Sequence, residues 1–245
     1  MIAAIADHAD LAADLVACTR LLVMEGVLEA SGHVSARIAG TDLILIQDRE
    51  TSRAAVTTDD LVIVDLEGEI VAGSGRPPAE TAIHTGVYRA RPDVMAVCHG
   101  HPETSVIFSV IDTPLVPVRH FAFEYPEGVP VHQDSRHIRT RQQGDELAAT
   151  LGDAPACLLR SHGSVVVAGD LKELLMDTLD LELNARTLLA AISAGTVRPI
   201  EAEEAAELRA SYAKNGFRAS KTWDHFTALG QHAGVLAPQT TITKE

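Results

Sequence analysis

The chain has 245 residues, with 20 lysine and arginine residues against 34 acidic ones, so its formal net charge at pH 7 is −14. This length suits one large α/β domain or two small ones, and a composition of 46% hydrophobic and 22% charged residues argues against disorder as the main state. The negative charge argues against nucleic acid and against anionic membranes as partners.

No segment approaches the roughly 18 uninterrupted apolar residues that a membrane span requires. The N-terminus carries Asp7 early and lacks a basic region, so we expect no signal peptide. The three cysteines, Cys18, Cys98 and Cys157, are scattered and make no disulfide framework. These features predict a protein of the reducing cytoplasm.

Helices and strands are predicted along most of the chain from the spacing of apolar residues and from Gly, Pro and capping residues. The predicted helices cover 7–29, 79–91, 102–109, 139–151, 170–193 and a charged stretch over 200–226. The predicted strands cover 34–38, 43–46, 61–66, 69–71, 94–98, 156–159 and 165–167. The two early hairpins argue against a purely parallel sheet, and we expect one domain over 1–226 with a tail over 227–245.

Histidines at two strand ends are the candidates for a metal site. His99 and His101 follow an apolar strand at positions i and i+2, so both imidazoles point to one face, with the small Gly100 between them. His162 follows a second apolar strand in the same way and precedes Gly163. Three neutral imidazoles with an open position are typical of a catalytic metal site, although a lone His-x-His pair can also be structural.

Glu80 is the fourth candidate for this site. It follows Pro77-Pro78-Ala79 at the start of a predicted helix, which would place its carboxylate at a loop mouth. A carboxylate beside a metal can act as a ligand, or as a general acid or base once substrate displaces it.

These residues belong to segments that resemble the class II aldolase/adducin family over about residues 8–195. The segments are Ser31-Gly32-His33-Val34-Ser35-Ala36-Arg37, Glu80-x3-His84-x3-Tyr88-Arg89-Ala90-Arg91-Pro92-Asp93, His99-Gly100-His101 and His162-Gly163. The resemblance implies an α/β/α layered fold with a central, mainly antiparallel sheet covered by helices. It also implies a divalent metal on the three histidines, Glu80 as acid/base, and a homotetramer with active sites near subunit interfaces.

Two positions depart from the sugar-phosphate aldolases of that family. Those enzymes have Gly-Asn where this chain has Gly32-His33, and Ser-Ser where it has Pro78-Ala79. Proline lacks an N–H donor and alanine lacks a hydroxyl, so we expect a substrate without phosphate. The Gly-His-Val-Ser-Ala-Arg form is more similar to the branch of metal-dependent decarboxylases of hydroxylated aromatic acids.

Five further residues are candidates for the substrate pocket. His33 could bind a carboxylate or donate a proton, and His84 lies one helical turn after Glu80 and could orient it or simply pack. Arg119 could hold a carboxylate through its fork, or be a surface residue, while His120 titrates near neutral pH. Tyr125 could donate a hydrogen bond or a proton, or be a buried core residue.

Trp223 and His225 near the C-terminus could cover a neighbouring subunit's site or make a docking contact. The other histidines, His8, His132, His137 and His232, are interpreted as structural or surface residues.

The leading hypothesis is a metal-dependent carbon–carbon lyase, a decarboxylase of a small non-phosphorylated hydroxy-aromatic or hydroxy/oxo carboxylic acid. Loss of CO2 leaves a carbanion that the bound metal stabilises as an enolate, and Glu80, His120 or His33 protonates the carbon. Zinc or manganese is the expected metal, with iron or cobalt as alternatives. The alternative functions are a class II aldolase or dehydratase, a non-haem iron oxygenase, and a non-catalytic adducin-like module.

Overall fold

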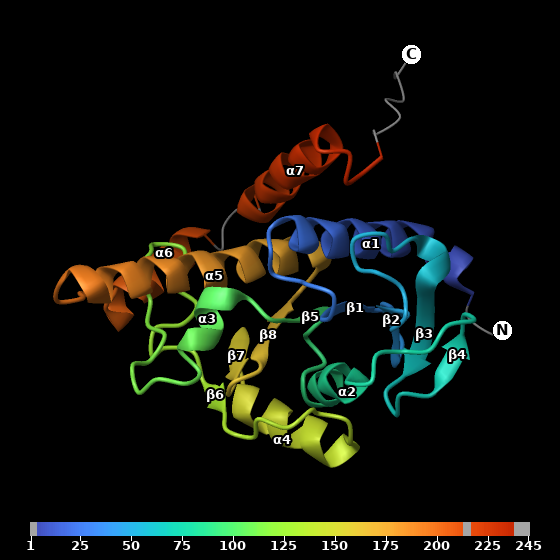
Figure 1. The fold of residues 1–245 in the computed structure, drawn as a ribbon, viewed down its shortest axis with the longest axis horizontal. Coiled ribbons are helices and arrows are strands. Elements are labelled where there is room, and N and C mark those ends of the chain that lie inside the picture. The colour runs from blue at the N-terminus through green and yellow to red at the C-terminus, as the bar shows by residue number, and fades with distance from the viewer. Residues whose placement is uncertain (1–3, 213–216, 238–245) are drawn as a thin grey trace.

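The computed structural model describes residues 4–212 and 217–237, which include an eight-stranded sheet in the order β4-β3-β2-β1-β5-β8-β7-β6 (Figure 1). Neighbouring strands are antiparallel except β6 and β7, which are parallel, so the expected mainly antiparallel sheet is confirmed. The strands are β1 (His33–Arg37), β2 (Leu43–Gln47), β3 (Leu61–Asp65), β4 (Ile70–Ala72), β5 (Ala96–Gly100), β6 (Val131–His132), β7 (Ala156–Leu159) and β8 (Gly163–Ala168).

Helices cover both faces of this sheet. The α-helices are α1 (Ala9–Met24), α2 (Thr81–Ala90), α3 (Glu103–Ile107), α4 (Arg141–Leu151), α5 (Leu171–Ala194), α6 (Ala202–Tyr212) and α7 (Phe217–His232), and the 3₁₀ turns are η1 (Ile5–His8) and η2 (Thr58–Asp60). In Figure 1, α1 and α5 lie on one side of the sheet, with α7 outside them, and α2 and α4 lie on the other. The layered α/β/α architecture is therefore confirmed.

Side chains of successive strand residues point to opposite faces of the sheet, so a separate hydrophobic core forms on each face. Val34, Ala36 and Cys98 pack with α1 and α5, whereas Val97 and Cys157 pack with α2 and α4. Successive strand residues point to opposite faces, so a strand buried on both sides reads as an unbroken apolar run. This explains why the runs over 94–98 and 156–159 are continuous.

Most predicted elements are present, with shifted ends. The helix predicted over 7–29 stops at Met24, because Gly26 adopts a φ of 74° that favours glycine. Asp170 caps α5 as predicted, since its side chain accepts from the backbone N–H groups of Lys172 and Glu173.

The C-terminal part of the chain stays helical beyond the predicted start of the tail. Helix α7 continues past position 226 to His232, and residues 238–245 of the predicted tail lie outside the described residues. No helix in the described ranges is long and apolar enough to cross a membrane.

The register of the central strands gathers the candidate histidines at one end of the sheet. His33 at the start of β1 pairs with His99 near the end of β5, and His99 pairs with Val165 near the start of β8. Antiparallel pairing thus brings one strand's beginning beside its neighbour's end. Residues 33, 99 and 162 become neighbours although they lie far apart in sequence.

Candidate metal centre and active site

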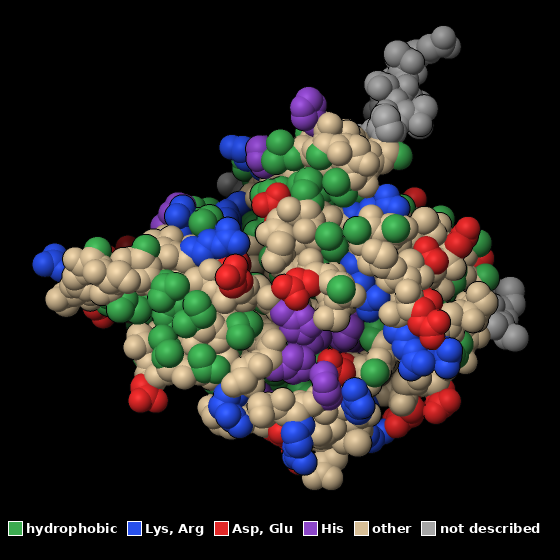
Figure 2. Space-filling model, in the orientation of Figure 1, with side chains coloured by type: hydrophobic (Ala, Val, Ile, Leu, Met, Phe, Trp, Pro, Cys, Tyr) green, Lys and Arg blue, Asp and Glu red, His purple; other side chains and the backbone are tan. Residues whose placement is uncertain are grey.

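Three imidazoles converge at this end of the sheet. His99, His101 and His162 each offer a ring nitrogen, and these atoms all lie within 4.8 Å of one another. Histidine side chains gather near the middle of the face shown in Figure 2. The predicted histidine set is brought together by the structure, in an arrangement that can hold a divalent ion.

His99 fits a metal ligand best of the three. Its Nδ1 lies 3.1 Å from the carbonyl oxygen of Ser164, so Nδ1 donates and Nε2 carries the lone pair. Nε2 is buried and has no hydrogen-bond partner in the described structure. Burial, followed by the neighbouring His101 and His162, lowers the pKa of His99 well below 6.5, which keeps the ring neutral. A neutral, oriented imidazole with an unused nitrogen is the form that binds a metal.

His101 and His162 complete the set from two loops. Nδ1 of His101 lies 3.5 Å from the Ser31 hydroxyl, and burial lowers the pKa of both imidazoles. A side chain at Gly163 would collide with the Gly100 carbonyl and approach the rings of His99 and His101. Glycine at position 163 is therefore required where the start of β8 approaches the end of β5.

Glu80 faces the same cluster from the N-terminus of α2. Its Oε2 lies 3.8 Å from Nε2 of His99 and 3.7 Å from Nε2 of His162. Its Oε1 accepts a hydrogen bond of 2.9 Å from the backbone N–H of Ile138. One oxygen is thus held by the backbone and the other is directed at the histidines, where it can bind metal or exchange a proton.

His137 is exposed, as predicted for a surface residue, and it also borders this cluster. Its Nδ1 lies 3.4 Å from Oε1 of Glu80, and its ring lies 5.5 Å from that of His162, centroid to centroid. The residue follows no strand and shares no spacing with the other histidines. Only its place immediately before the predicted helix over 139–151 could have drawn attention to it.

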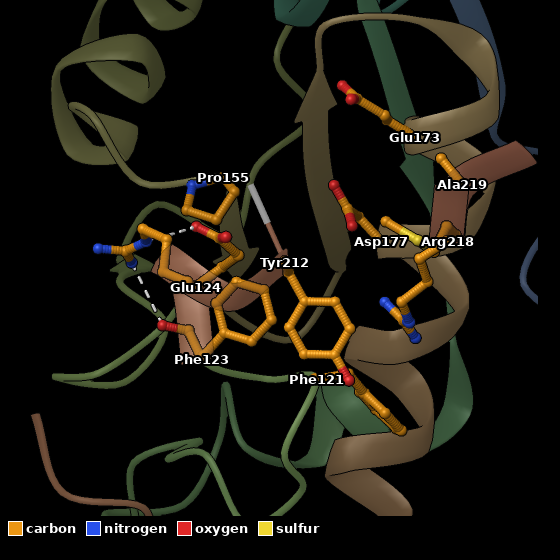
Figure 3. Close-up of a pocket in the computed structure, with 11 residues that line it drawn as sticks. Phe121, Phe123, Glu124, Pro155, Glu173, Asp177, Tyr212, Arg218 and Ala219 are labelled. Carbon is orange, nitrogen blue, oxygen red and sulfur yellow. Dashed lines mark hydrogen bonds and ion pairs between the residues drawn. The ribbon is translucent and has the colours of Figure 1, made fainter. Parts of the chain in front are cut away.

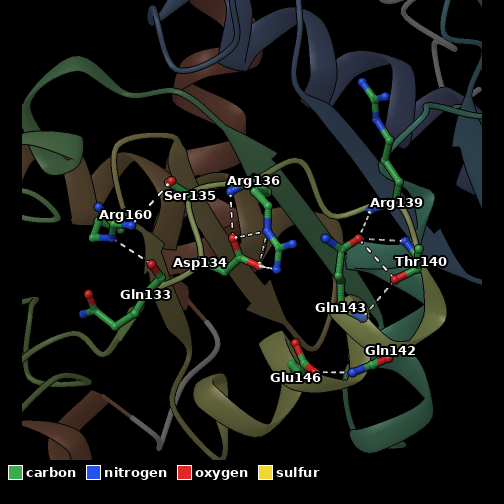
Figure 4. Close-up of polar contacts among 10 residues, drawn as sticks. All are labelled: Gln133, Asp134, Ser135, Arg136, Arg139, Thr140, Gln142, Gln143, Glu146 and Arg160. Atoms are coloured by element: carbon green, nitrogen blue, oxygen red, sulfur yellow. Dashed lines mark hydrogen bonds and ion pairs between the residues drawn. The ribbon is translucent and has the colours of Figure 1, made fainter.

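The segment that carries His137 is held by local polar contacts (Figure 4). Arg136 donates to both carboxylate oxygens of Asp134, and Thr140 and Gln143 form a capping box at the start of α4. Arg160, which precedes the turn bearing His162, donates to the carbonyl of Gln133. The two loops that flank Glu80 are therefore tied to each other.

His33 and His84 lie beside the candidate metal ligands as part of a buried series of hydrogen bonds. His33 offers a ring nitrogen within 4.8 Å of ligand atoms of Glu80 and His99. Its Nδ1 lies 2.6 Å from Nε2 of His84, and Nδ1 of His84 lies 2.6 Å from the Ser35 hydroxyl. His84 therefore contacts His33 rather than orienting Glu80.

Arg119, His120 and Tyr125 lie elsewhere in the chain. The Arg119 guanidinium lies over the Phe121 ring and 3.4 Å from the hydroxyl of Thr187 on α5. Exposed His120 faces Tyr212 of α6. Tyr125 is buried, and burial followed by the charges of three nearby carboxylates raises its pKa. Within the described ranges, none of their contacts reaches the histidine cluster.

A cavity of about 410 Å³ lies near these three residues, bordered by α5, α6 and α7 (Figure 3). Phe121, Phe123 and Tyr212 line it together with Glu124 and Asp177. It contains none of the predicted metal ligands.

The C-terminal candidates Trp223 and His225 lie on α7. Trp223 is 7% exposed and borders a groove between α1 and α7, whereas His225 is exposed. Within this chain Trp223 therefore makes a docking contact.

Comparison with known proteins agrees with this geometry. Residues 13–189 match the family model described as Class II Aldolase and Adducin N-terminal domain. A 3,4-dihydroxyphthalate decarboxylase from Rhodococcus jostii is 33% identical over 187 residues, which are 71% of this chain and 75% of the relative.

Solved structures show the same fold. An aldolase II superfamily protein from Pseudomonas syringae has a TM-score of 0.81 and 25% identity, covering 92% of this chain and 94% of that one. An l-fuculose-1-phosphate aldolase from Thermus thermophilus has a TM-score of 0.66 and 29% identity, covering 78% and 99% respectively.

Proposed function

Because the chain belongs to the class II aldolase and adducin family, we propose that it is a divalent-metal-dependent carbon–carbon lyase that decarboxylates a small, non-phosphorylated hydroxy-aromatic or hydroxy/oxo carboxylic acid. The observation that carries the proposal is the free oxygen of Glu80, which lies 3.8 Å and 3.7 Å from the imidazoles of His99 and His162. This pairing of a proton-transfer group with an ion-binding group suits the cleavage of a bond next to a carboxylate.

His99, His101 and His162 would hold the ion, for which we propose zinc or manganese. When bound, the ion would supply Lewis-acid stabilisation of the negative charge that develops as CO2 leaves. Glu80 delivers a proton from Oε2 to the carbon that loses CO2, and the Ile138 N–H holds the other oxygen in place during transfer. The overall reaction consumes one proton and releases CO2.

The segment before Glu80 supports a substrate without phosphate. The Pro78 carbonyl is occupied by the backbone N–H of Thr81 and by its hydroxyl at 2.6 Å. Pro78 has no N–H and Ala79 has no hydroxyl, so this segment offers few donors to a phosphate group. The 3,4-dihydroxyphthalate decarboxylase among the relatives supports a hydroxylated aromatic acid as the substrate class.

We further propose a homotetramer with sites near subunit interfaces. Val110 and Ile111 after α3 are 55% and 42% exposed, and Leu183 on α5 is 39% exposed. Glu182, the neighbour of Leu183, accepts hydrogen bonds from the backbone N–H groups of Thr104 and Ser105, so α3 and α5 are adjacent there. Exposed apolar side chains on or beside these two elements support a subunit interface in this region. The proposed substrate roles of Arg119, His120 and Tyr125 require that they face a neighbouring subunit's site.

The decisive experiment measures CO2 release from a panel of aromatic and aliphatic hydroxy acids by protein purified without chelator, together with its metal content. We expect release from at least one ortho-hydroxy aromatic acid, and none from the same acids after His99→Ala. Cleavage of an unphosphorylated aldol without CO2 release would instead indicate an aldolase, the activity named for the Thermus thermophilus relative. Undiminished metal content after combined His99→Ala and His162→Ala would overturn the site.

The subunit proposal has its own test. Inactive Glu80→Gln and His120→Ala subunits are mixed, unfolded together and refolded. If His120 serves a neighbouring site, mixed tetramers contain some intact sites and regain activity. Mixtures that stay inactive would refute this role of His120.

A further inference from the structure

A chain of buried polar side chains runs from the metal site into the core through His33, His84, Ser35 and Tyr88. The ring contacts of His33 with His84 and of His84 with Ser35 are both 2.6 Å long. The Ser35 hydroxyl lies 2.9 Å from the Tyr88 hydroxyl, which also donates to the Ser35 carbonyl at 3.1 Å. All four side chains are at most 4% exposed, so water does not compete for these bonds.

The donor and acceptor of each hydrogen bond between His33 and Tyr88 follow from the contacts of the Tyr88 hydroxyl. A carbonyl oxygen can only accept, so the single Tyr88 proton goes to the carbonyl of Ser35. The Tyr88 oxygen must then accept from the Ser35 hydroxyl, and the Ser35 oxygen must accept from Nδ1–H of His84. Nε2 of His84 is therefore a lone pair, and it accepts from Nδ1–H of His33.

Both imidazoles must be neutral for this assignment to hold. Both rings are buried, His33 at 4% and His84 at 0% exposure, which disfavours the charged form, and burial lowers the pKa of His84 to about 3. With its proton on Nδ1, His33 carries a lone pair on Nε2. No hydrogen bond to that Nε2 occurs among the residues that the structure describes, and His33 is the member of the chain that borders Glu80 and His99.

We infer that Tyr88, Ser35 and His84 are positioning residues that hold His33 in the Nδ1–H tautomer, so that its Nε2 accepts a hydrogen bond from a substrate hydroxyl beside the metal site. The substrate part of this inference rests on the proposed function. It narrows the substrate to acids with an O–H group next to the carboxylate, because a carbonyl or ether oxygen at that place would meet a lone pair. Sites built to accept a hydrogen bond reject analogues that lack the donor.

The first test measures the tautomer directly in metal-free protein with ¹⁵N-labelled histidine rings. The His33 signals are assigned by their loss in His33→Asn. We expect a protonated Nδ1 and a lone-pair Nε2 in the wild type. A wild-type protein with the proton on Nε2 would overturn the inference, whether or not the protein releases CO2 from any acid.

The second test removes the Tyr88 hydroxyl, which sets the donor–acceptor direction of the hydrogen bonds from Ser35 to His33. In Tyr88→Phe the Ser35 hydroxyl loses its acceptor and can donate to His84, so the Nε2–H tautomer of His33 should increase. Ser35→Ala, which cuts the chain, provides a second variant if Tyr88→Phe folds poorly. Tyr212→Phe, which alters a tyrosine of α6 outside this set of hydrogen bonds, should leave the tautomer unchanged. An unchanged tautomer in both Tyr88→Phe and Ser35→Ala would refute the positioning role.

The third test compares binding of salicylate and its methyl ether, 2-methoxybenzoate, to the metal-loaded protein by calorimetry. One hydrogen bond to a hydroxyl corresponds to a preference for salicylate of about tenfold in Kd. Tyr88→Phe should reduce that ratio. Equal affinity of the wild type for the two acids would overturn the substrate part, while the CO2-release panel reports separately on the lyase proposal.

Discussion

At the scale of single residues, the site depends on which atom of each side chain is already engaged. Glu80 has one oxygen bonded to the backbone of Ile138, and His99 has one nitrogen bonded to the Ser164 carbonyl. In both cases the remaining atom faces the cluster. Replacing the oxygen of Glu80 or the nitrogen of His99 that faces the cluster should therefore abolish catalytic activity. The atom of each side chain that bonds the backbone should matter mainly for the fold.

Replacing Glu80 by glutamine should lower kcat about 10²- to 10⁴-fold, the usual contribution of a general acid or base. The glutamine keeps an oxygen for the Ile138 N–H, and the three histidines retain the metal, so metal content should stay unchanged. Glu146→Gln, on the exposed side of α4, is the matched control. Nearly full activity in Glu80→Gln would exclude the acid/base role.

His84 makes stability depend on pH in a predictable direction. Burial lowers its pKa from 6.5 to about 3, so the folded state binds fewer protons than the unfolded state between these values. Its contribution to stability is fully present above about pH 6.5 and is lost as the pH falls toward about 3.

Between pH 6 and 4, the unfolding free energy of the metal-free wild type should fall more steeply than that of His84→Gln, by about 1.4 kcal/mol per pH unit. Urea unfolding at several pH values measures both slopes, with exposed His225→Gln as the control. Equal slopes in the wild type and His84→Gln would contradict a depressed pKa.

At the scale of elements, the contact between α2 and α4 holds Glu80 in place. Gly86 and Gly144 face each other there, and a side chain on Gly144 would collide with the backbone carbonyl of Ala82. This close approach brings Ile138, just before α4, to the first turn of α2. The site thus depends on two glycines that lie outside it.

Gly144→Ala should force the helices apart and lower the unfolding free energy by about 1–3 kcal/mol, the usual cost of overpacking. It should also weaken catalysis, since the Ile138 N–H moves with α4. Gly195→Ala is the control, because a side chain there meets no atom within 4 Å. Denaturant unfolding and CO2 release measure the two effects. A Gly144→Ala protein as stable as the wild type would contradict a close contact between α2 and α4 at this position.

At the scale of the whole molecule, a bound ion would join the end of β5 to the turn between β7 and β8. Binding to the folded state alone stabilises a protein, by about 2.7 kcal/mol when the ligand is at a hundred times its Kd. Removing the metal with a chelator should therefore lower Tm, and adding it back should restore Tm. The combined His99→Ala and His162→Ala variant should show no such response. An identical metal-dependent rise in that variant would place the ion elsewhere.

Much of the fold, and the histidine cluster of the candidate metal site, was predictable from the sequence. Apolar periodicity indicated most helices and strands, and the predicted membership in the class II aldolase and adducin family is confirmed. The short β6 was missed, because its two residues make no periodic pattern and their pairing with β7 is set by the packing of α4. The proximity of His137 to Glu80 was missed for a similar reason, since the two residues lie 57 positions apart in the chain.

The sequence by itself determined the types of candidate ligand, because the identity of a residue fixes its side-chain chemistry. It also showed that each histidine at a strand end has a glycine beside it. Only the tertiary structure decided which residues meet. Strand register put His33 beside His99, and the packing of α4 on α2 brought Ile138 and His137 to Glu80. It also separated Arg119, His120 and Tyr125 from their own chain's site. Such contacts depend on the arrangement of distant elements, which local spacing does not encode.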